Sequence, residues 1–346
     1  MNRRFGARWL LWCALLLFSG ATEAAARSYP MDTMAPRSDL AELIQSVYVQ
    51  VTLWDLLVLV VVIVALFLAI FWFSTRFGEP GEEPVQFHSH MGLEVAWTAG
   101  PILILVLITV PTVRAVFNTQ PYHWPKEALT VRVIAHQWWW EFRYPSLGAQ
   151  TANEVHIPAD RMIHFELESA DVIHSFWMPA LGGKRDVVPG QINQITLVAK
   201  VPGEYYGQCA EFCGASHANM RFRVFVDTAE GFQRWVADQL KPPVMPASGL
   251  ASEGARIYQN APCAICHRVK GISGFSKQYE GGFRGPDLTH FAGRSTLAAG
   301  VLDNTPDNLA TWIQDPQTVK PGALMPRLGL KGHELTALVA YLESLK

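Results

Sequence analysis

Residues 209–220 read Cys209-Ala-Glu-Phe-Cys213-Gly-Ala-Ser-His217-Ala-Asn-Met220, and this stretch decides how the rest of the chain is interpreted. It places two thiols, an imidazole and a thioether within one short segment. Soft sulfur ligands combined with imidazole are typical of copper sites. A mononuclear electron-transfer site uses one cysteine and two histidines. Because this motif has two cysteines, it predicts two copper ions bridged by both sulfur atoms.

Each copper of such a pair also needs a terminal histidine, so a second histidine has to come from elsewhere in the chain. His174, which follows a predicted strand over 163–169, is the best candidate. A disulfide between Cys209 and Cys213 and a tetrahedral zinc site are the alternatives. Met220 is a poor zinc ligand, and no second cysteine-rich half accompanies the motif.

The sequence around the motif has the period of β-strands. Apolar side chains recur at every second position in three stretches, 131–135, 163–167 and 222–226. Pro-Gly turns at 189–190 and 202–203 separate such stretches. Short alternating strands with turns of this kind predict a β-sandwich or barrel, which we assign to residues 118–241.

The start of the chain carries a targeting pattern. Basic residues precede an apolar run over 9–18, and three consecutive alanines follow. This order is typical of a secretory signal peptide, which we assign to residues 1–26. An uncleaved membrane anchor and a lipid attachment at Cys13 are the alternatives.

Two longer apolar runs follow, 53–73 and 95–113. Each is long enough to cross a hydrocarbon core of about 30 Å. We therefore predict an external N-terminal segment over 27–48 and a transmembrane helical hairpin over 49–117. The loop between the runs has more acidic than basic residues and does not follow the positive-inside rule, so the signal peptide has to set the orientation.

A second cofactor motif lies beyond a proline-rich linker over 242–250. It reads Cys263-Ala-Ile-Cys266-His267, the attachment motif of c-type haem. The two cysteines form thioethers to the porphyrin, and the histidine is the proximal iron ligand. Because such haem is attached outside the cytoplasm, the motif supports the orientation given by the signal peptide. It predicts a helical haem domain over 251–346.

An electron-transfer haem needs a second axial ligand, usually methionine. Met325 is the only methionine after the attachment motif, and it precedes a proline. His290 and His333 are the rivals. We expect Met325 to be the ligand, because the Leu-Met-Pro sequence resembles the distal-ligand loop of small cytochromes c.

Several stretches together resemble cytochrome c oxidase subunit II over about residues 40–235. They are 135–142, 171–175, 181–190 and 209–220. The resemblance implies a cupredoxin-like, all-β barrel that holds the dinuclear CuA centre. Cys209 and Cys213 would bridge the copper ions, and His174 and His217 would be their terminal ligands.

The resemblance also implies roles for four further residues. Met220 would be a weak axial ligand to one copper, and the backbone carbonyl of Glu211 would bind the other. The Glu211 carboxylate would bind magnesium shared with subunit I. Trp138 matches the aromatic residue at which electrons enter the family's copper centre. The alternative is that Trp138 only packs among other aromatic side chains. Glu94 matches a carboxylate at the mouth of a proton channel in the family. The alternative is that the helix macrodipole favours a carboxylate at this helix N-terminus.

Subunit II followed by a class I, all-α cytochrome c domain is the arrangement of the fused, caa-type haem–copper oxidases. The resemblance implies a bacterial inner-membrane protein with both cofactor domains on the outer side. Electrons would pass from an external donor, such as cytochrome c or a respiratory complex, through haem c and CuA to subunit I, where oxygen is reduced to water.

Subunit III and membrane lipid are the further partners that the resemblance implies. The formal net charge of −2 gives no indication of a nucleic-acid partner. Two other functions fit part of the pattern. One is the electron-input subunit of a CuA-containing nitric oxide reductase, and the other is a membrane-tethered copper assembly protein.

Overall fold

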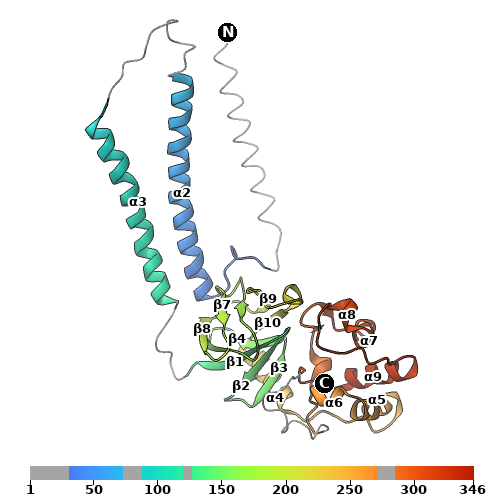
Figure 1. The fold of residues 1–346 in the computed structure, drawn as a ribbon. Helices are drawn as coiled ribbons and strands as arrows, with labels where there is room; N and C mark the ends of the chain where they lie inside the picture. The colour runs from blue at the N-terminus through green and yellow to red at the C-terminus, as the bar shows by residue number, and fades with distance from the viewer. Residues whose placement is uncertain (1–30, 73–87, 120–126, 272–284) are drawn as a thin grey trace, which may run out of the picture.

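The computed structural model describes residues 31–72, 88–119, 127–271 and 285–346, which form a helical hairpin, a β-domain and a helical domain (Figure 1). The predicted signal peptide over 1–26, the alternative lipid site at Cys13 and most of the acidic loop between the apolar runs lie outside these residues.

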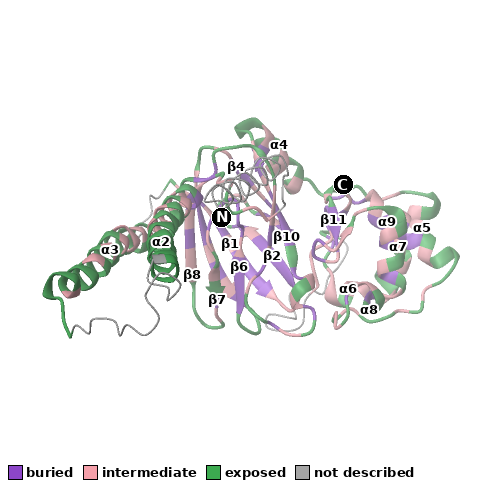
Figure 2. Ribbon diagram, turned by 90° about the horizontal axis from the view of Figure 1, so that it is seen from above, coloured by how far each residue is buried: buried purple, intermediate pink, exposed green. Residues whose placement is uncertain are grey.

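Two long helices stand side by side and extend away from the β-domain (Figure 1). They are α2 (Asp39–Trp72) and α3 (Met91–Asn118), and both are long and apolar enough to cross a membrane. Their side chains are almost all exposed, as Figure 2 shows. Apolar surface of this extent is stable in lipid rather than in water, which agrees with the predicted transmembrane hairpin.

Helix α2 begins at Asp39, well before the predicted hairpin boundary at residue 49. Contacts with the β-domain fix this start. The Ser38 hydroxyl accepts a hydrogen bond from the Ala41 N–H (3.1 Å) and donates to the Leu181 carbonyl (2.5 Å). The Asp39 carboxylate accepts from the Val198 N–H (2.8 Å). The first turns of α2 therefore pack on the β-domain. The apolar run in the sequence marks only the later, membrane-length part of the helix and does not predict this start.

The β-domain consists of two five-stranded sheets. The first has the order β3 (Ala149–Ala152), β2 (Trp139–Tyr144), β1 (Leu129–His136), β5 (Met162–Ser169) and β8 (Asn193–Val198). The second has the order β4 (Glu154–Pro158), β10 (Arg221–Asp227), β9 (Gly203–Cys209), β6 (His174–Trp177) and β7 (Arg185–Val187). The pairs β1–β5 and β4–β10 are parallel, and the others are antiparallel.

The core lies between these sheets (Figure 2). The predicted alternation is correct, since Val131, Val133 and Ala135 are fully buried. Aromatic rings fill the centre, where Phe176 and Phe222 stack with centroids 4.6 Å apart. Burying a side chain of this size stabilises the fold by about 1.5–3 kcal/mol. Strand β9 of this core ends at Cys209, the first residue of the copper motif.

The chain leaves the β-domain through α4 (Ala229–Leu240), which no pattern in the sequence predicted. Its capping residue is Thr228, whose hydroxyl accepts from the Gly231 N–H (3.1 Å). After the linker, α5 begins at Gly249, slightly inside the predicted linker boundary at residue 250.

The haem domain is mostly helical, as predicted. Besides α5 (Gly249–Asn260), it contains α6 (Cys263–Cys266), α7 (Pro306–Gln314), α8 (Pro316–Val319), α9 (His333–Ser344), the 3-10 turn η4 (Phe291–Gly293) and a small sheet of β11 (Thr296–Leu297) and β12 (Leu302–Asp303). Helices α5 and α9 pack together, with the Tyr258 and Tyr341 ring centroids 5.6 Å apart.

Candidate metal and haem sites

The sulfur and imidazole groups of the copper motif meet where β6 and β9 adjoin. Strand β6 begins at His174, and its neighbour β9 ends at Cys209. The Cys209 N–H bonds to the Met220 carbonyl (2.9 Å), which folds the intervening loop back on itself. As a result, Cys213 Sγ lies 3.7 Å and His174 Nδ1 lies 3.8 Å from Cys209 Sγ.

The remaining predicted ligands surround the same two sulfur atoms. His217 Nδ1 is 3.5 Å and Met220 Sδ is 3.9 Å from Cys213 Sγ. The Glu211 carbonyl oxygen is 3.3 Å from Cys209 Sγ. The two thiols are not bonded to each other. Two sulfurs, two imidazoles, a thioether and a carbonyl fit a copper pair and exceed what a four-coordinate zinc ion needs.

The two thiols differ in acidity. The hydrogen bond between the two thiols, reinforced by His174, lowers the pKa of Cys209 even though burial opposes this. The same bond to Cys209, together with burial, raises the pKa of Cys213. The thiolate is the form that binds metal, so metal binding would release the protons that the two thiols hold.

Asp171 orients the His174 ring. Its carboxylate lies 2.8 Å from Nε2 of His174 and also accepts from the Gln137 N–H (2.6 Å). Burial acts to lower the pKa of His174, but the bonds to Asp171 and Cys209 raise it above its ordinary value. A carboxylate behind a metal-binding imidazole fixes the nitrogen that faces the metal. Asp171 belongs to one of the stretches that carry the family resemblance, but its sequence position alone did not predict this role.

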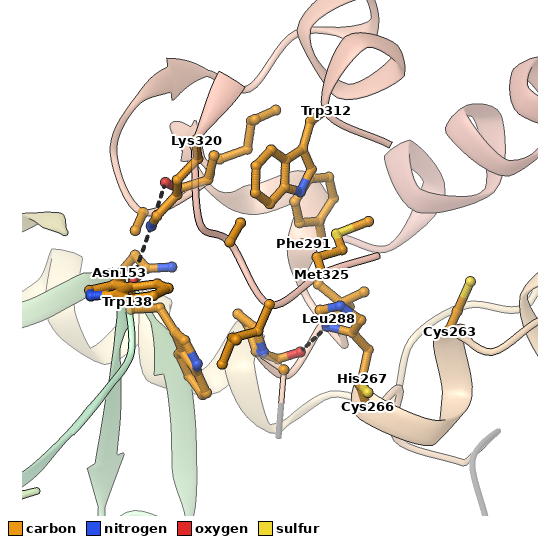
Figure 3. Close-up of a pocket in the computed structure, with 18 of the residues that line it drawn as sticks. Trp138, Asn153, Cys263, Cys266, His267, Leu288, Phe291, Trp312, Lys320 and Met325 are labelled. Carbon is orange, nitrogen blue, oxygen red and sulfur yellow. Dashed lines mark hydrogen bonds between the residues drawn. The ribbon is translucent and has the colours of Figure 1, made fainter. Parts of the chain in front are cut away.

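The haem attachment motif lines a cavity of about 220 Å³ (Figure 3). Cys263, Cys266, His267 and Met325 all face it, together with apolar walls such as Phe291. His267 Nδ1 donates to the Pro286 carbonyl (2.8 Å), which leaves Nε2 available for iron. Burial lowers the pKa of His267, so the imidazole is neutral, as a metal ligand must be. These residues fit a covalent haem.

Met325 is better placed than its two rivals. His290 Nε2 donates to the Gln239 carbonyl (3.0 Å), and His333 pairs with Glu253 (2.6 Å) at the surface. The described residues that line the haem cavity include Met325, but they include neither His290 nor His333.

Trp138 contacts both cofactor sites. Its indole Nε1 donates to the Cys213 carbonyl (3.0 Å), and its ring lines the haem cavity. On the haem side, a Cβ placed on Gly322 would lie 3.7 Å from the ring. The Ser216 hydroxyl also donates to the Pro321 carbonyl. The loop over 210–220, called the copper loop, and the haem-domain loop over 320–325 therefore meet at Trp138. Figure 3 shows Trp138 and Met325 on the haem side of this contact.

Glu94 lies in the first turn of α3 and makes the contact of a capping residue. Its carboxylate accepts from the His90 N–H (3.1 Å), while His90 Nδ1 accepts from the Leu93 N–H (3.2 Å). This geometry accounts for a carboxylate at the position. The proton-channel role of Glu94 stays a prediction.

Two buried charged residues at the junction of the domains had no sequence signature. Glu154 of β4 is 2% exposed and accepts hydrogen bonds from the Ser295–Thr296 turn of the haem domain. Lys320 is 4% exposed and donates to the Trp138 carbonyl (2.5 Å). Burial lowers the pKa of Lys320 to about 7, and both forms of the amine can donate a hydrogen bond.

Family models match three parts of the chain. Residues 26–115 match the transmembrane domain of cytochrome c oxidase subunit II, residues 147–226 match its periplasmic domain, and residues 251–346 match cytochrome c.

Relatives match over most of the chain. It is 38% identical to cytochrome c oxidase subunit 2 of Alkalihalophilus pseudofirmus over 78% of each chain. It is 34% identical to the subunit of the same name in Bacillus subtilis, over 91% of this chain and 92% of the relative. A solved periplasmic domain of subunit II from Bradyrhizobium japonicum is 33% identical, covers 33% of this chain and 95% of that domain, and has a TM-score of 0.32.

The matched family implies a CuA copper centre, a cytochrome c domain implies haem, and the geometry provides ligands for both. The two apolar helices and the periplasmic domain fit a protein of the inner membrane, and a subunit II implies a subunit I partner. The chain therefore belongs to the cytochrome c oxidase subunit II family, as an electron-transfer subunit of an oxidoreductase that carries a cytochrome c domain at its C-terminus.

Proposed function

We propose that this chain carries electrons from an external donor, through its own haem domain and copper domain, to subunit I of a caa-type cytochrome c oxidase. When bound, haem c at Cys263, Cys266 and His267 and a copper pair at Cys209 and Cys213 would each supply one-electron redox chemistry, and the electrons would leave for subunit I, where oxygen would be reduced to water. The donor is cytochrome c or a respiratory complex.

A single observation carries this proposal. Trp138 donates a hydrogen bond to the carbonyl of Cys213 and lines the cavity that contains Met325 and the attachment motif. One aromatic side chain thus joins the two sites. We propose that electrons enter the copper centre at Trp138 from the attached haem.

The roles of the site residues follow from their contacts. Cys209 and Cys213, together with His174 and His217, would hold the copper pair. The Glu211 carbonyl lies 3.3 Å from Cys209 Sγ and the Met220 thioether lies 3.9 Å from Cys213 Sγ, which supports their proposed role as weak copper ligands. The Glu211 side chain is exposed, so its carboxylate is free to share a magnesium ion with subunit I.

Cys263 and Cys266 attach the haem, and His267 and Met325 ligate its iron. We propose that α2 and α3 anchor the chain in the bacterial inner membrane, with both cofactor domains on the outer side and in contact with lipid and subunits I and III. Glu94, at the start of α3, is proposed to lie at a proton-channel mouth.

Removal of each cofactor separately tests the assignment in the purified oxidase complex. Cys209→Ser should abolish the mixed-valence copper spin signal and oxygen consumption, because one bridging sulfur is lost, while haem c absorption remains. Cys263→Ala is the reciprocal control and should weaken the covalent haem attachment while the copper signal remains. Metal analysis of the wild type should return two copper ions in this chain.

Zinc, a single copper, or a copper signal that survives Cys209→Ser would contradict the copper assignment. Reduction of nitric oxide in place of oxygen by the intact complex would favour a nitric oxide reductase. Copper that exchanges readily with a chelator, in a chain that supports no oxygen consumption, would favour an assembly protein.

A further inference from the structure

The contact between the haem domain and the copper domain is built from buried polar groups. One oxygen of the Glu154 carboxylate accepts from the Thr296 N–H (2.7 Å) and from the hydroxyls of Ser295 (2.8 Å) and Thr296 (2.9 Å). Its other oxygen accepts from the Ser295 N–H (3.1 Å). A carboxylate of the copper domain is thus surrounded by donors of the haem domain.

Lys320 makes the opposite contact, from the haem domain to the copper domain. Its Nζ donates to the carbonyl of Trp138 (2.5 Å) and to that of Ala298 (3.2 Å) (Figure 3). The two domains also share a small apolar cluster of Trp139 and Ala152 from the copper domain and Ala299 from the haem domain, all buried. The Arg221 N–H also donates to the Ala299 carbonyl (3.1 Å).

These contacts differ from those at a transient interface between two proteins that meet by diffusion. Encounter surfaces are wet and carry charges at an exposed rim, whereas Glu154 and Lys320 are almost fully buried. Buried hydrogen bonds are directional, and without Glu154 four donors would be left unpaired in the docked arrangement. The orientation in the structure satisfies both charged groups at once.

We propose that Glu154 and Lys320 are positioning residues that keep the haem domain permanently docked at Trp138, so that electrons cross from one fixed arrangement and not by repeated encounters. This inference rests on the proposed electron route. It also means that an external donor approaches the haem domain, because the haem-domain loop at Pro321 and Gly322 already occupies the copper-domain surface beside Trp138 and Ser216.

The test measures electron transfer from haem c to copper in the intact oxidase, after a light pulse reduces the haem through a photoexcited ruthenium complex. In the wild type we expect one phase whose rate does not change when glycerol raises the viscosity. The double variant Glu154→Leu/Lys320→Met keeps side-chain volume but removes both charges. Loss of the charged hydrogen bonds at each residue lowers the docking constant by about tenfold or more, and by about a hundredfold or more for the two together, so transfer should slow by at least about tenfold and become sensitive to viscosity.

A matched control carries the same substitutions at exposed sites of the same domains. Glu230→Leu/Lys331→Met should leave the rate and its independence of viscosity unchanged, since both side chains are exposed. In the docking variant, the copper spin signal and both reduction potentials should also stay at their wild-type values, because neither residue binds a cofactor.

Several outcomes would overturn the inference. They are an unchanged rate in the docking variant, a wild-type rate that already depends on viscosity, and a slower rate accompanied by an altered copper potential. If the double variant fails to accumulate, Glu154→Gln, which keeps one acceptor oxygen, should give a smaller slowing, and no slowing would count against the proposal. If haem c in the wild type never reduces the copper, the proposed function fails instead.

Discussion

Trp138 lies between two loops that approach it closely, and each loop has a glycine at the contact. Gly214 belongs to the copper loop, and a Cβ on it would lie 3.0 Å from the indole ring. Gly322 belongs to the haem-domain loop, has a φ of +85°, and would place a Cβ 2.8 Å from the Cβ of Ala215. These residues determine how closely the two sites can approach.

We predict that Gly322→Ala slows electron transfer from haem c to copper several-fold. The new Cβ would overlap Ala215, whose own Cβ is fixed to the backbone, so the haem-domain loop must move away from Trp138. Gly329→Ala is the matched control, because Gly329 has a similar φ of +73° and open space around it. Both changes carry a backbone cost of about 1–2 kcal/mol, measurable by thermal unfolding. Equal transfer rates in the two variants would contradict the prediction.

At this scale the sequence gives candidate ligands wherever they share a local motif. Cys209, Cys213 and His217 are close in sequence, so their spacing and chemistry are enough to identify a metal site. Glu154 and Lys320 were not predicted, because each contact joins residues more than a hundred positions apart. A buried charge has no local signature, since the sequence does not say which surface will cover it.

The strands of the first sheet are joined by a buried carboxylate as well as by their backbones. Glu141 on β2 accepts from His136 Nε2 on β1 (3.1 Å), Arg143 Nε (2.6 Å) and Gln150 Nε2 on β3 (2.8 Å). Burial acts to raise the pKa of Glu141, but the hydrogen bonds from His136 and Arg143 lower it below its ordinary value of 4.5. The charged form is therefore the one that stabilises the folded domain.

This shift gives a prediction for stability against pH. A carboxyl group whose pKa is lower in the folded chain stabilises the fold above pH 4.5, and that contribution is lost as the pH falls through the folded-state pKa. Glu141→Gln should lower the free energy of unfolding by about 1–2 kcal/mol at pH 7. Urea unfolding at several pH values should show the difference between the two proteins shrinking as the pH falls below 4.5. A constant difference at all pH values would contradict the assignment.

Elements were predictable where a single periodicity dominates. The continuous apolar runs predicted α2 and α3, and the alternation at 131–135 predicted β1. The start of α2 at Asp39 and the whole of α4 were missed. Both are amphipathic segments whose apolar sides pack on the β-domain, so their helical form depends on tertiary contacts and not on composition.

At the scale of the whole molecule, the haem domain is attached to the copper domain in two ways, by the chain and by the docked surface. The linker between α4 and α5 is exposed, with Val244 at 78% and Met245 at 42%. A tether alone gives a high effective concentration of donor, while docking adds a fixed orientation. Cutting the tether separates these two contributions.

We predict that the haem domain stays on the copper domain after the linker is cut. A specific protease site introduced at Val244–Met245 in the intact oxidase would break the chain without touching Glu154 or Lys320. Because the buried hydrogen bonds remain, haem c absorption should co-purify with the copper signal on a sizing column, and oxygen consumption should persist. The same cut in Glu154→Leu/Lys320→Met should release the haem domain, since the tether was then its main attachment. Release from the cut wild type would mean that covalent linkage, and not docking, holds the donor in place.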